Sequence, residues 1–210
     1  MIPVGIVTNR MWTTAVRFGG EHVAMPDSGP NQIPPRLAPF LAQWDYVVGV
    51  LLERLEGLSD KEFLWRPSER VWTVRPRGDG RSRPDAEVWP PTAEAAPPRT
   101  LAWSIDHLGA GSLTRADYLV GGHRLQDDDL TWPLTAREGV EFMKGGLNAW
   151  RTGLDQMTDE DLDTIGRSAY PGGLDPTLPL IEIVWWVNKE LVFHAGEIWL
   201  MRDLYAAMHQ

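Results

Sequence analysis

Two histidines and one glutamate are the residues of this chain whose types and spacing best suit metal chemistry. Glu190 and His194 stand four residues apart in a segment whose apolar residues recur at helical spacing. Residues at i and i+4 lie one turn apart on the same side of a helix, so both side chains can reach one point. His107 stands in a second helical segment. Both segments are expected to pack against other helices, where a buried carboxylate such as that of Glu190 needs a partner. A divalent metal ion is the simplest partner for all three residues.

The donor set indicates what kind of metal site this would be. Two imidazoles and one carboxylate, with no fourth protein ligand evident, are typical of catalytic zinc sites, in which water or substrate takes the remaining position. The same donors also suit nickel, iron and manganese. The alternative is that His194 is a hydrogen-bonded core histidine and that Glu190 pairs with an arginine of a neighbouring helix. The pattern alone leaves both open.

Three further residues are candidates for the surroundings of this site. Glu197 follows His194 by less than one turn and could act as a general base or hold a ligand in place, although an ion pair with an arginine is an equal alternative. Trp103, one turn before His107, and His123, in a glycine-rich loop, could line a pocket. The alternatives are core packing for Trp103 and simple solvation for His123.

Two acidic features are not expected to join the site. Asp106 precedes His107, but its side chain points about 100° away around the helix. The run from Asp127 to Asp129 lacks the alternating oxygen ligands and the following glycine of an EF-hand loop, so we expect a solvated loop there.

Composition narrows the class of protein. The 210 residues fit one domain with a sizeable core. A net charge of −9 disfavours binding to nucleic acid. The absence of cysteine excludes disulfides, thiolate ligands and a cysteine nucleophile, so thiol chemistry would need an external thiol. The sequence shows no leader segment and no apolar run that could span a bilayer, so we expect a cytoplasmic protein without a membrane partner.

The elements that must position these residues are helices. Residues 1–36 are rich in proline and glycine and predict an irregular arm, with one short strand at Val4 to Val7. Residues 66–99 predict a long loop that crosses from one end of a bundle to the other. No other strand pattern is convincing. We therefore predict an all-α fold, a four-helix bundle with long crossover loops in residues 37–210. The four helices are expected near residues 37–57, 100–119, 135–157 and 178–208.

Three stretches resemble the DinB-like (YfiT-like) superfamily of metalloenzymes. They are LWRPSERVWTVR at 64–75, PRTLAWSIDHL at 98–108 and HAGEIWLMRDLY at 194–205. The resemblance covers roughly residues 37–208 and implies a four-helix bundle with a divalent metal, usually zinc or nickel, held by three side chains. His107 falls on the first ligand position and His194 on the last. Glu190 stands where most members have histidine, and this His-Glu-His set is similar to the mycothiol-dependent maleylpyruvate isomerase branch.

The resemblance also implies a function. It indicates an enzyme acting on a small molecule, a thiol-dependent S-transferase or isomerase that uses mycothiol or bacillithiol and whose metal lowers the pKa of the thiol. A hydrolase in which the metal activates water would need the same three ligands. The alternative from another class is a non-catalytic metal- or ligand-binding dimeric helical bundle. Members commonly pair through their helices, so a homodimer is expected.

Overall fold

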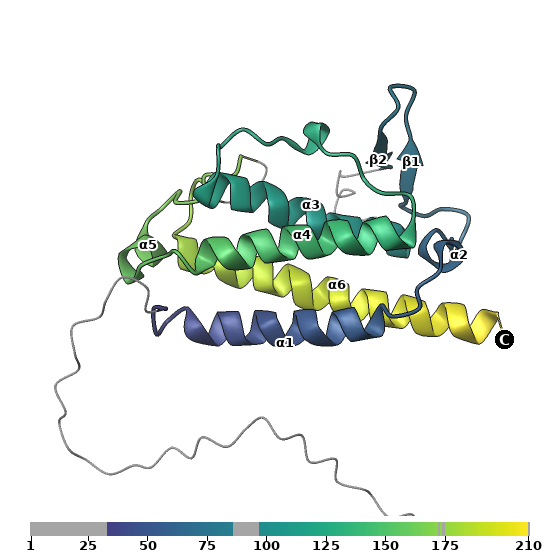
Figure 1. Cartoon of the computed structure of the whole chain (residues 1–210), viewed down its shortest axis with the longest axis horizontal. Coiled ribbons are helices and arrows are strands. Elements are labelled where there is room, and N and C mark those ends of the chain that lie inside the picture. Colours follow the sequence, from purple (N-terminus) through teal and green to yellow (C-terminus); the bar gives the residue numbers. More distant parts are fainter. Residues whose placement is uncertain (1–32, 86–96, 172, 174, 210) are drawn as a thin grey trace, which may run out of the picture. The chain divides into compact units, whose positions relative to one another are not determined.

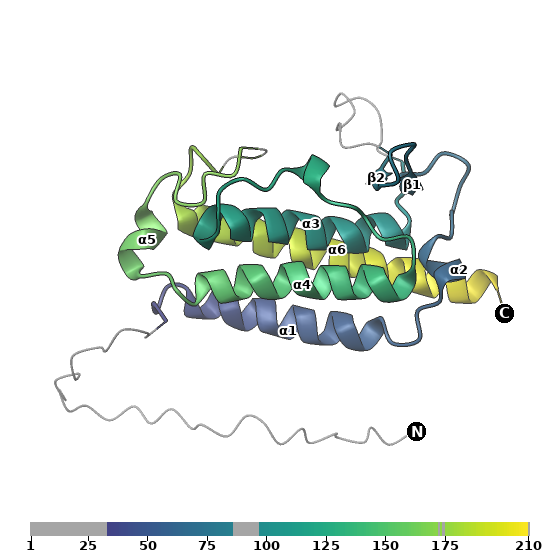
Figure 2. The ribbon, with the colours of Figure 1, turned by 45° about the horizontal axis from the view of Figure 1, so that its top comes forward.

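The computed structural model describes residues 33–85, 97–171, 173 and 175–209, and residues 33–210 form one compact unit. Four long helices lie side by side in it and confirm the predicted all-α bundle (Figure 1, Figure 2). Most of the expected arm, including the strand at Val4 to Val7, lies outside the described residues. The four helices are α1 (Ala38–Arg54), α3 (Leu101–Val120), α4 (Ala136–Leu154) and α6 (Leu180–Met208).

Helices α1 and α6 run in the same direction. The Asn188 amide, in the first half of α6, donates to the Phe40 carbonyl oxygen at the start of α1 over 2.8 Å, and Arg54 at the end of α1 forms an ion pair with Asp203 near the end of α6. Because both contacts join early to early and late to late positions, the two helices are parallel. Buried apolar residues of both helices, such as Leu51 of α1, belong to one shared core.

Helices α3 and α4 form the second parallel pair, and they approach very closely. A Cβ atom placed on Gly146 would lie only 2.1 Å from the Gly109 carbonyl oxygen, and one placed on Gly153 would lie 3.2 Å from Leu119. Glycine at position 146 is therefore required for this approach of the two backbones. Between the pairs the helices run antiparallel, since Ser104 near the start of α3 contacts Glu197 in the second half of α6.

The segment that crosses the bundle is residues 121–135, which joins the end of α3 to the start of its parallel partner α4 (Figure 1, Figure 2). The prediction that residues 66–99 make this crossing is wrong. The backbone N–H of Trp72 donates to the Pro98 carbonyl and that of Thr100 donates to the Trp72 carbonyl, over 3.0 and 2.9 Å. That long connection therefore leaves and returns at the same end of the bundle.

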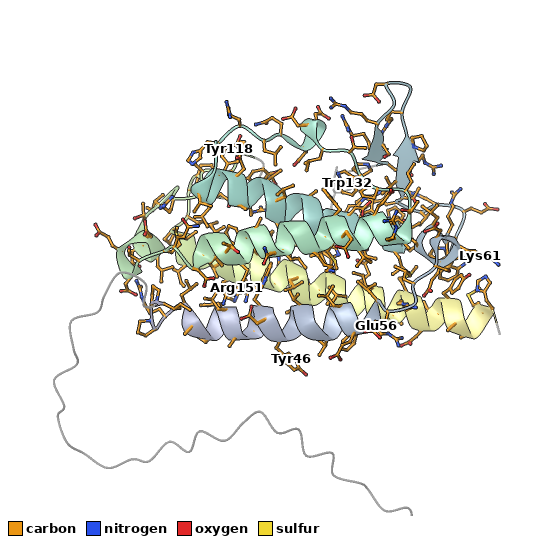
Figure 3. The ribbon with its side chains drawn as sticks, viewed as in Figure 1. Tyr46, Glu56, Lys61, Tyr118, Trp132 and Arg151 are labelled. Atoms are coloured by element: carbon orange, nitrogen blue, oxygen red, sulfur yellow. The ribbon has the colours of Figure 1, made fainter. Side chains whose placement is uncertain are left out.

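A short hairpin inside this connection is a second correction. Strands β1 (Val74–Pro76) and β2 (Ser82–Pro84) pair antiparallel, and Gly80 occupies a left-handed conformation with φ +80° in the turn between them. Each strand has only three residues and ends in proline, so no strand pattern can be detected in the sequence here. The hairpin is fixed to the crossing segment, because the backbone N–H of Trp132, labelled in Figure 3, donates to the Ser82 carbonyl over 3.1 Å.

Side-chain caps explain why the helices begin where they do. Thr100, Thr135 and Ser59 each accept a hydrogen bond from the backbone N–H three residues later, which satisfies one free donor of α3, α4 and the short helix α2 (Asp60–Phe63). The starts of α3 and α4 agree with the sequence prediction. Two further one-turn helices were not expected from the sequence, α5 (Asp159–Asp163) and the 3-10 turn η1 (Asp127–Asp129).

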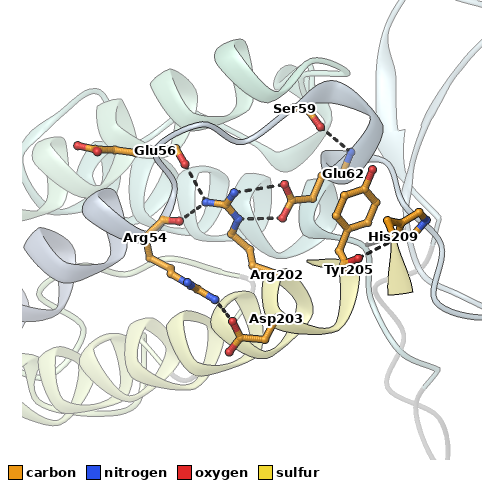
Figure 4. Close-up of polar contacts among 8 residues, drawn as sticks. All are labelled: Arg54, Glu56, Ser59, Glu62, Arg202, Asp203, Tyr205 and His209. Atoms are coloured by element: carbon orange, nitrogen blue, oxygen red, sulfur yellow. Dashed lines mark hydrogen bonds and ion pairs between the residues drawn. The ribbon is translucent and has the colours of Figure 1, made fainter. Parts of the chain in front are cut away.

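Arg202 joins three elements at the far end of α6. Its guanidinium donates to both carboxylate oxygens of Glu62, over 2.8 and 3.2 Å, and to the backbone carbonyls of Arg54 and Glu56 (Figure 4). These carbonyls lie at the end of α1 and just beyond it, where no helical N–H remains to bond them. Arg202 therefore fastens α1 and α2 to α6, which keeps the second half of α6 beside the start of α3.

No helix in the described ranges combines the length and apolar character needed to cross a membrane.

The helices differ in which side chains they expose on their outer sides. On α1 the exposed Tyr46 points away from the bundle (Figure 3), whereas on α6 large apolar side chains are exposed along much of the helix.

Candidate metal centre

Helix α3 presents His107 at the end of a stack of three side chains. Trp103 and His107 lie one turn apart on one side of the helix, and Arg99 directly precedes the N-cap residue Thr100. The Arg99 guanidinium carbon lies 4.9 Å from the centre of the Trp103 ring, and the rings of Trp103 and His107 are stacked at 4.7 Å with 13° between their planes. This packing fixes the orientation of the His107 imidazole.

Helix α6 brings Glu190 and His194 to His107. One ligand atom of each residue lies within 4.8 Å of the other two. His194 Nε2 and Glu190 Oε2 are 3.6 Å apart, and the rings of His107 and His194 are 4.8 Å apart between their centres. The structure therefore assembles the three residues that the sequence singled out.

Glu197 holds the second nitrogen of His194. Its Oε2 atom lies 2.8 Å from His194 Nδ1 and also accepts from the Ser104 hydroxyl over 3.0 Å. Its other oxygen accepts from Arg99 Nη1 over 2.8 Å. The arginine ion pair and the contact with a proposed ligand were separate expectations for Glu197, and the structure contains both. Arg99 thus reaches His194 through Glu197 and His107 through Trp103.

Lys189 lies beside the carboxylate of the cluster. Its Nζ atom is 2.9 Å from Glu190 Oε1 and 3.3 Å from the centre of the Trp186 ring. The other carboxylate oxygen, Oε2, is the one that faces His194. Glu190 therefore points one oxygen toward the cluster while the other is bound by a lysine of its own helix.

The two imidazoles have opposite electrostatic environments. Burial, together with the nearby charge of His194, lowers the pKa of His107 to about 3, so this ring is neutral. Burial also acts to lower the pKa of His194, but the carboxylates of Glu190 and Glu197 outweigh it and the pKa is raised. Without a metal ion the proton of the cluster therefore belongs on His194.

Both glutamates remain ionised. Burial acts to raise the pKa of Glu190, but His194 and Lys189 more than offset this and hold it at about 2. Burial acts in the same direction on Glu197, whose pKa is held at about 2 by His194 and Arg99. The cluster thus offers a carboxylate at any pH near neutrality.

The donors fit a divalent ion. Ligands held at about 2.0–2.1 Å around a tetrahedral ion lie roughly 3.3 Å from one another, close to the 3.6 Å between His194 Nε2 and Glu190 Oε2. His194 has Nδ1 engaged by Glu197 and leaves Nε2 for the ion, which is the carboxylate–histidine–metal arrangement of many sites. A small rotation of the side chains would close the wider separations of up to 4.8 Å.

Two other residues considered from the sequence lie elsewhere. Asp106 is fully buried and points toward α4, where its Oδ1 lies 3.0 Å from the position of a Cβ on Gly139. Neither of its carboxylate oxygens has a hydrogen-bond partner among the described residues, and burial raises its pKa well above the usual value. His123 lies beyond the end of α3, with its ring 5.8 Å from Tyr118. The structure does not bring His123 to the cluster.

Sequence reasoning missed Arg99, Ser104 and Lys189 as neighbours of the cluster. Ser104 and Arg99 reach Glu197 across 93 and 98 residues of chain, and no local pattern signals contacts of that range. For Lys189 the sequence holds one signal, because a lysine directly before Glu190 lies close enough to pair with its carboxylate.

A separate hollow of about 480 Å³ lies around the end of α6 and is lined in part by Arg202 and Asp203, whose partners are drawn in Figure 4. Arg202 is bound by Glu62, and Asp203 is bound by Arg54. These charged groups hold the helices together and are already paired, and none of the described residues that line the hollow belongs to the donor group of His107, Glu190 and His194.

The comparisons with known proteins agree with this architecture. Searches of curated protein sequences and of solved structures give no significant match. The family model described as the DinB superfamily matches residues 43–198, which include His107, Glu190 and His194. Because that match covers most of the chain, from the first helix of the bundle to the last, the chain belongs to the DinB superfamily.

Proposed function

We propose that this chain is a divalent-metal-dependent enzyme that acts on a small molecule. The observation that carries the proposal is the cluster of His107, Glu190 and His194, with His194 Nδ1 held by Glu197. The three residues would be the ligands, and zinc or nickel fits this mixture of imidazole and carboxylate donors best. Three protein ligands leave a position for solvent or substrate.

The roles of the residues follow from their contacts. When bound, the ion would supply a Lewis acid that lowers the pKa of a thiol or water molecule. Glu197 holds Nδ1 of His194 and so leaves Nε2 to bind the ion, and Glu197 is itself fixed by Ser104 and Arg99. Trp103 covers one face of the His107 ring and excludes water from it. Since Glu197 already has three partners, positioning is better supported for it than proton transfer.

Within this class we favour a thiol-dependent S-transferase or isomerase with mycothiol or bacillithiol as cosubstrate. The chain has no cysteine, so a sulfur nucleophile must come from outside. The carboxylate of Glu190 in the middle ligand position supports the same choice through the resemblance to the isomerase branch. A cytoplasmic location would suit such chemistry, because low-molecular-weight thiols stay reduced there.

A non-catalytic metal- or ligand-binding bundle is the second candidate. Burial is the observation that favours it, since His194 is only 7% exposed and Trp103 only 5%. A site so enclosed could hold an ion without admitting a substrate. Hydrolysis is a third reading of the same ligands and needs no thiol.

Thiol adduct formation tests these alternatives. The protein is loaded with zinc or nickel and incubated with monochlorobimane and, in separate reactions, mycothiol, bacillithiol or glutathione. The proposal predicts faster adduct formation with one of these thiols, retained in His123→Ala and lost in His107→Ala. Equal rates with and without the loaded protein would favour the non-catalytic bundle. Cleavage of a model ester in the absence of thiol would favour the hydrolase.

A further inference from the structure

Three cations of the described chain stand around the metal cluster, and they differ in how tightly they are bound. Arg99 donates to Glu197 over 2.8 Å, and Lys189 lies 2.9 Å from Glu190. The polar contacts of Arg115, on α3, are all 3.4 Å or longer. Charged N–H groups normally bind a carboxylate oxygen at about 2.7–2.9 Å. Arg115 is therefore the least tightly bound of the three.

The guanidinium of Arg115 is largely enclosed but incompletely hydrogen-bonded. Its side chain is 14% exposed, and its central carbon lies 4.7 Å from the centre of the Tyr170 ring. Asp175 lies 3.4 Å from both Nε and Nη2, yet Nε forms no hydrogen bond with any described residue. Asp175 in turn accepts from the Ser168 hydroxyl over 2.8 Å. An enclosed charge that is bound so weakly has room for a further partner.

The guanidinium of Arg115 folds back along α3 toward the metal cluster. Its Nη1 atom lies 3.5 Å from the Gly111 carbonyl oxygen. The same atom lies 3.7 Å from the position that a Cβ would take on Gly111, and no other described side chain comes within 4 Å of that position. Gly111 follows His107 by one helical turn, or about 6 Å along the axis. Both residues are only partly buried, and glycine at position 111 places no side chain between His107 and the guanidinium.

The charges around the cluster favour an anionic ligand. Burial is the main cause of the low pKa of His107, and the charge of Arg115 is among the smaller causes that lower it further. The carboxylates of Glu190, Glu197 and Asp175 each face a cation of their own. These charges cancel in pairs, so the charge of a bound divalent ion would stand uncompensated. Such a site attracts an anion more strongly than a neutral molecule.

We propose that Arg115 binds a carboxylate group of the small molecule that occupies the open position of the metal ion. This role requires the metal centre of the proposed function. It makes the substrate class a small acid whose carboxylate lies a few bonds from the atom that binds the ion. The planar guanidinium can donate two parallel N–H groups to a carboxylate, which gives the contact its direction. Arg115 thus determines specificity, while His107, Glu190 and His194 hold the ion.

A purely structural ion pair is the alternative role for Arg115. Asp175 belongs to the loop that precedes α6, and its pairing with Arg115 ties this loop to α3. That role explains the contact with Asp175 but not the Nε–H group that has no hydrogen-bond partner among the described residues. A structural ion pair would also not distinguish a ligand with a carboxylate from one without it. The preference between two such ligands is therefore the quantity to measure.

Two matched thiols, 3-mercaptopropionate and 3-mercaptopropan-1-ol, test the proposal. They have the same chain length and differ in whether the far end is a carboxylate or a hydroxyl group. The full chain is loaded with cobalt(II) in place of zinc, and the thiolate-to-cobalt absorbance in the near ultraviolet is titrated to give the Kd of each thiol. The wild type should bind 3-mercaptopropionate at least about ten-fold more tightly. This readout is binding, so it does not depend on knowing the reaction.

Substitutions separate recognition by Arg115 from chelation of the ion by both ends of the thiol. Arg115→Met should reduce the preference for 3-mercaptopropionate at least about ten-fold. Arg115→Lys should retain part of the preference, because the charge remains while the planar fork is lost. Asp175→Asn removes the competing carboxylate and should increase the preference. Arg137→Met is the matched control and should leave it unchanged, because Arg137 is an exposed arginine on α4.

Two results would overturn the role of Arg115 and leave the metal centre intact. One is a wild type that binds cobalt and binds both thiols equally well. The other is an Arg115→Met variant with unchanged circular dichroism and the wild-type preference, which would assign the preference to chelation alone. If Arg115→Met does not fold, an unchanged preference in Asp175→Asn contradicts the proposal instead. A wild type that binds no cobalt would contradict the proposed function itself, and the role of Arg115 with it.

Discussion

His194 Nδ1 and Glu197 Oε2 lie 2.8 Å apart on one face of α6, three residues from each other. This contact engages Nδ1, so Nε2 is the nitrogen of His194 that remains to bind a metal ion. The ring presents Nε2 to Glu190 and His107, so the inward-facing atoms of three residues converge. The cluster is thus held in place by a carboxylate that is itself bound to α3.

Replacing Glu197 tests this positioning role. Glu197→Ala should weaken binding of zinc by about 10- to 100-fold, as is usual when the partner of a metal-binding histidine is removed. Glu197→Gln should recover part of the loss, because the amide oxygen can still accept from Nδ1. Titration calorimetry would measure the Kd, with Glu182→Ala on the exposed first turn of α6 as control. An unchanged Kd in Glu197→Ala would show that Glu197 does not position His194 for metal binding.

The middle ligand position offers a matched pair of substitutions. Glu190→Ala removes one of three donors and should sharply weaken binding of a divalent ion. Glu190→His puts an imidazole at the same i, i+4 spacing from His194 and should retain one bound ion per chain. Metal content after dialysis would be read by mass spectrometry. Equal metal content in Glu190→Ala and the wild type would show that Glu190 is not a ligand.

The sequence allowed the bundle and the cluster to be predicted because both depend on helical spacing. The stripes of apolar residues predict four helices, and the four-residue spacing of Glu190 and His194 predicts that these two side chains lie on one face of the last helix. The partners of Glu197 could not be predicted in this way. Arg99 and Ser104 reach it only after α3 and α6 have packed.

Topology was the other limit of sequence reasoning. The proline-rich composition of residues 66–99 predicts a crossover between the two ends of the bundle. The backbone hydrogen bonds of Trp72 with Pro98 and Thr100 instead return this connection to the end of the bundle where it begins. The hairpin of β1 and β2 was missed because three-residue strands that end in proline have no period to detect.

Two neighbouring glycines of α4 should respond oppositely to alanine. A Cβ on Gly146 would meet the Gly109 carbonyl oxygen at 2.1 Å, whereas one on Gly145 would meet nothing within 4 Å. Gly146→Ala should therefore lower the free energy of unfolding by about 1–3 kcal/mol. Gly145→Ala should raise it by up to about 1 kcal/mol, because alanine favours the helix. Urea denaturation would measure both, and equal effects would contradict the close contact of α3 with α4.

Asp117 should make stability depend on acid pH. Its carboxylate accepts from the backbone N–H groups of Leu125, Arg124 and Gly122 over 2.9, 2.8 and 2.8 Å. These bonds, that of Leu125 foremost, hold the pKa of Asp117 below its usual value. A lowered pKa in the folded state contributes stability above the unfolded value of about 3.9. This contribution is lost as the pH falls through the folded pKa.

Asp117→Asn should consequently lower stability at pH 7 by about 1–2 kcal/mol. Its difference from the wild type should narrow below about pH 4. Thermal unfolding monitored by circular dichroism from pH 7 to pH 3 would measure the difference. Asp128→Asn is the control, since that side chain is 97% exposed and its loss should change little. A constant difference between Asp117→Asn and the wild type across this range would contradict the assignment.

Metal stoichiometry of the purified protein tests the central claim most directly. After reconstitution with zinc or nickel and removal of excess ion, the wild type and His123→Ala should each hold one ion per chain. His107→Ala and His194→Ala should hold none while circular dichroism shows the same helical content. No bound ion in the wild type, or one ion retained in both His107→Ala and His194→Ala, would contradict a metal centre formed by His107, Glu190 and His194.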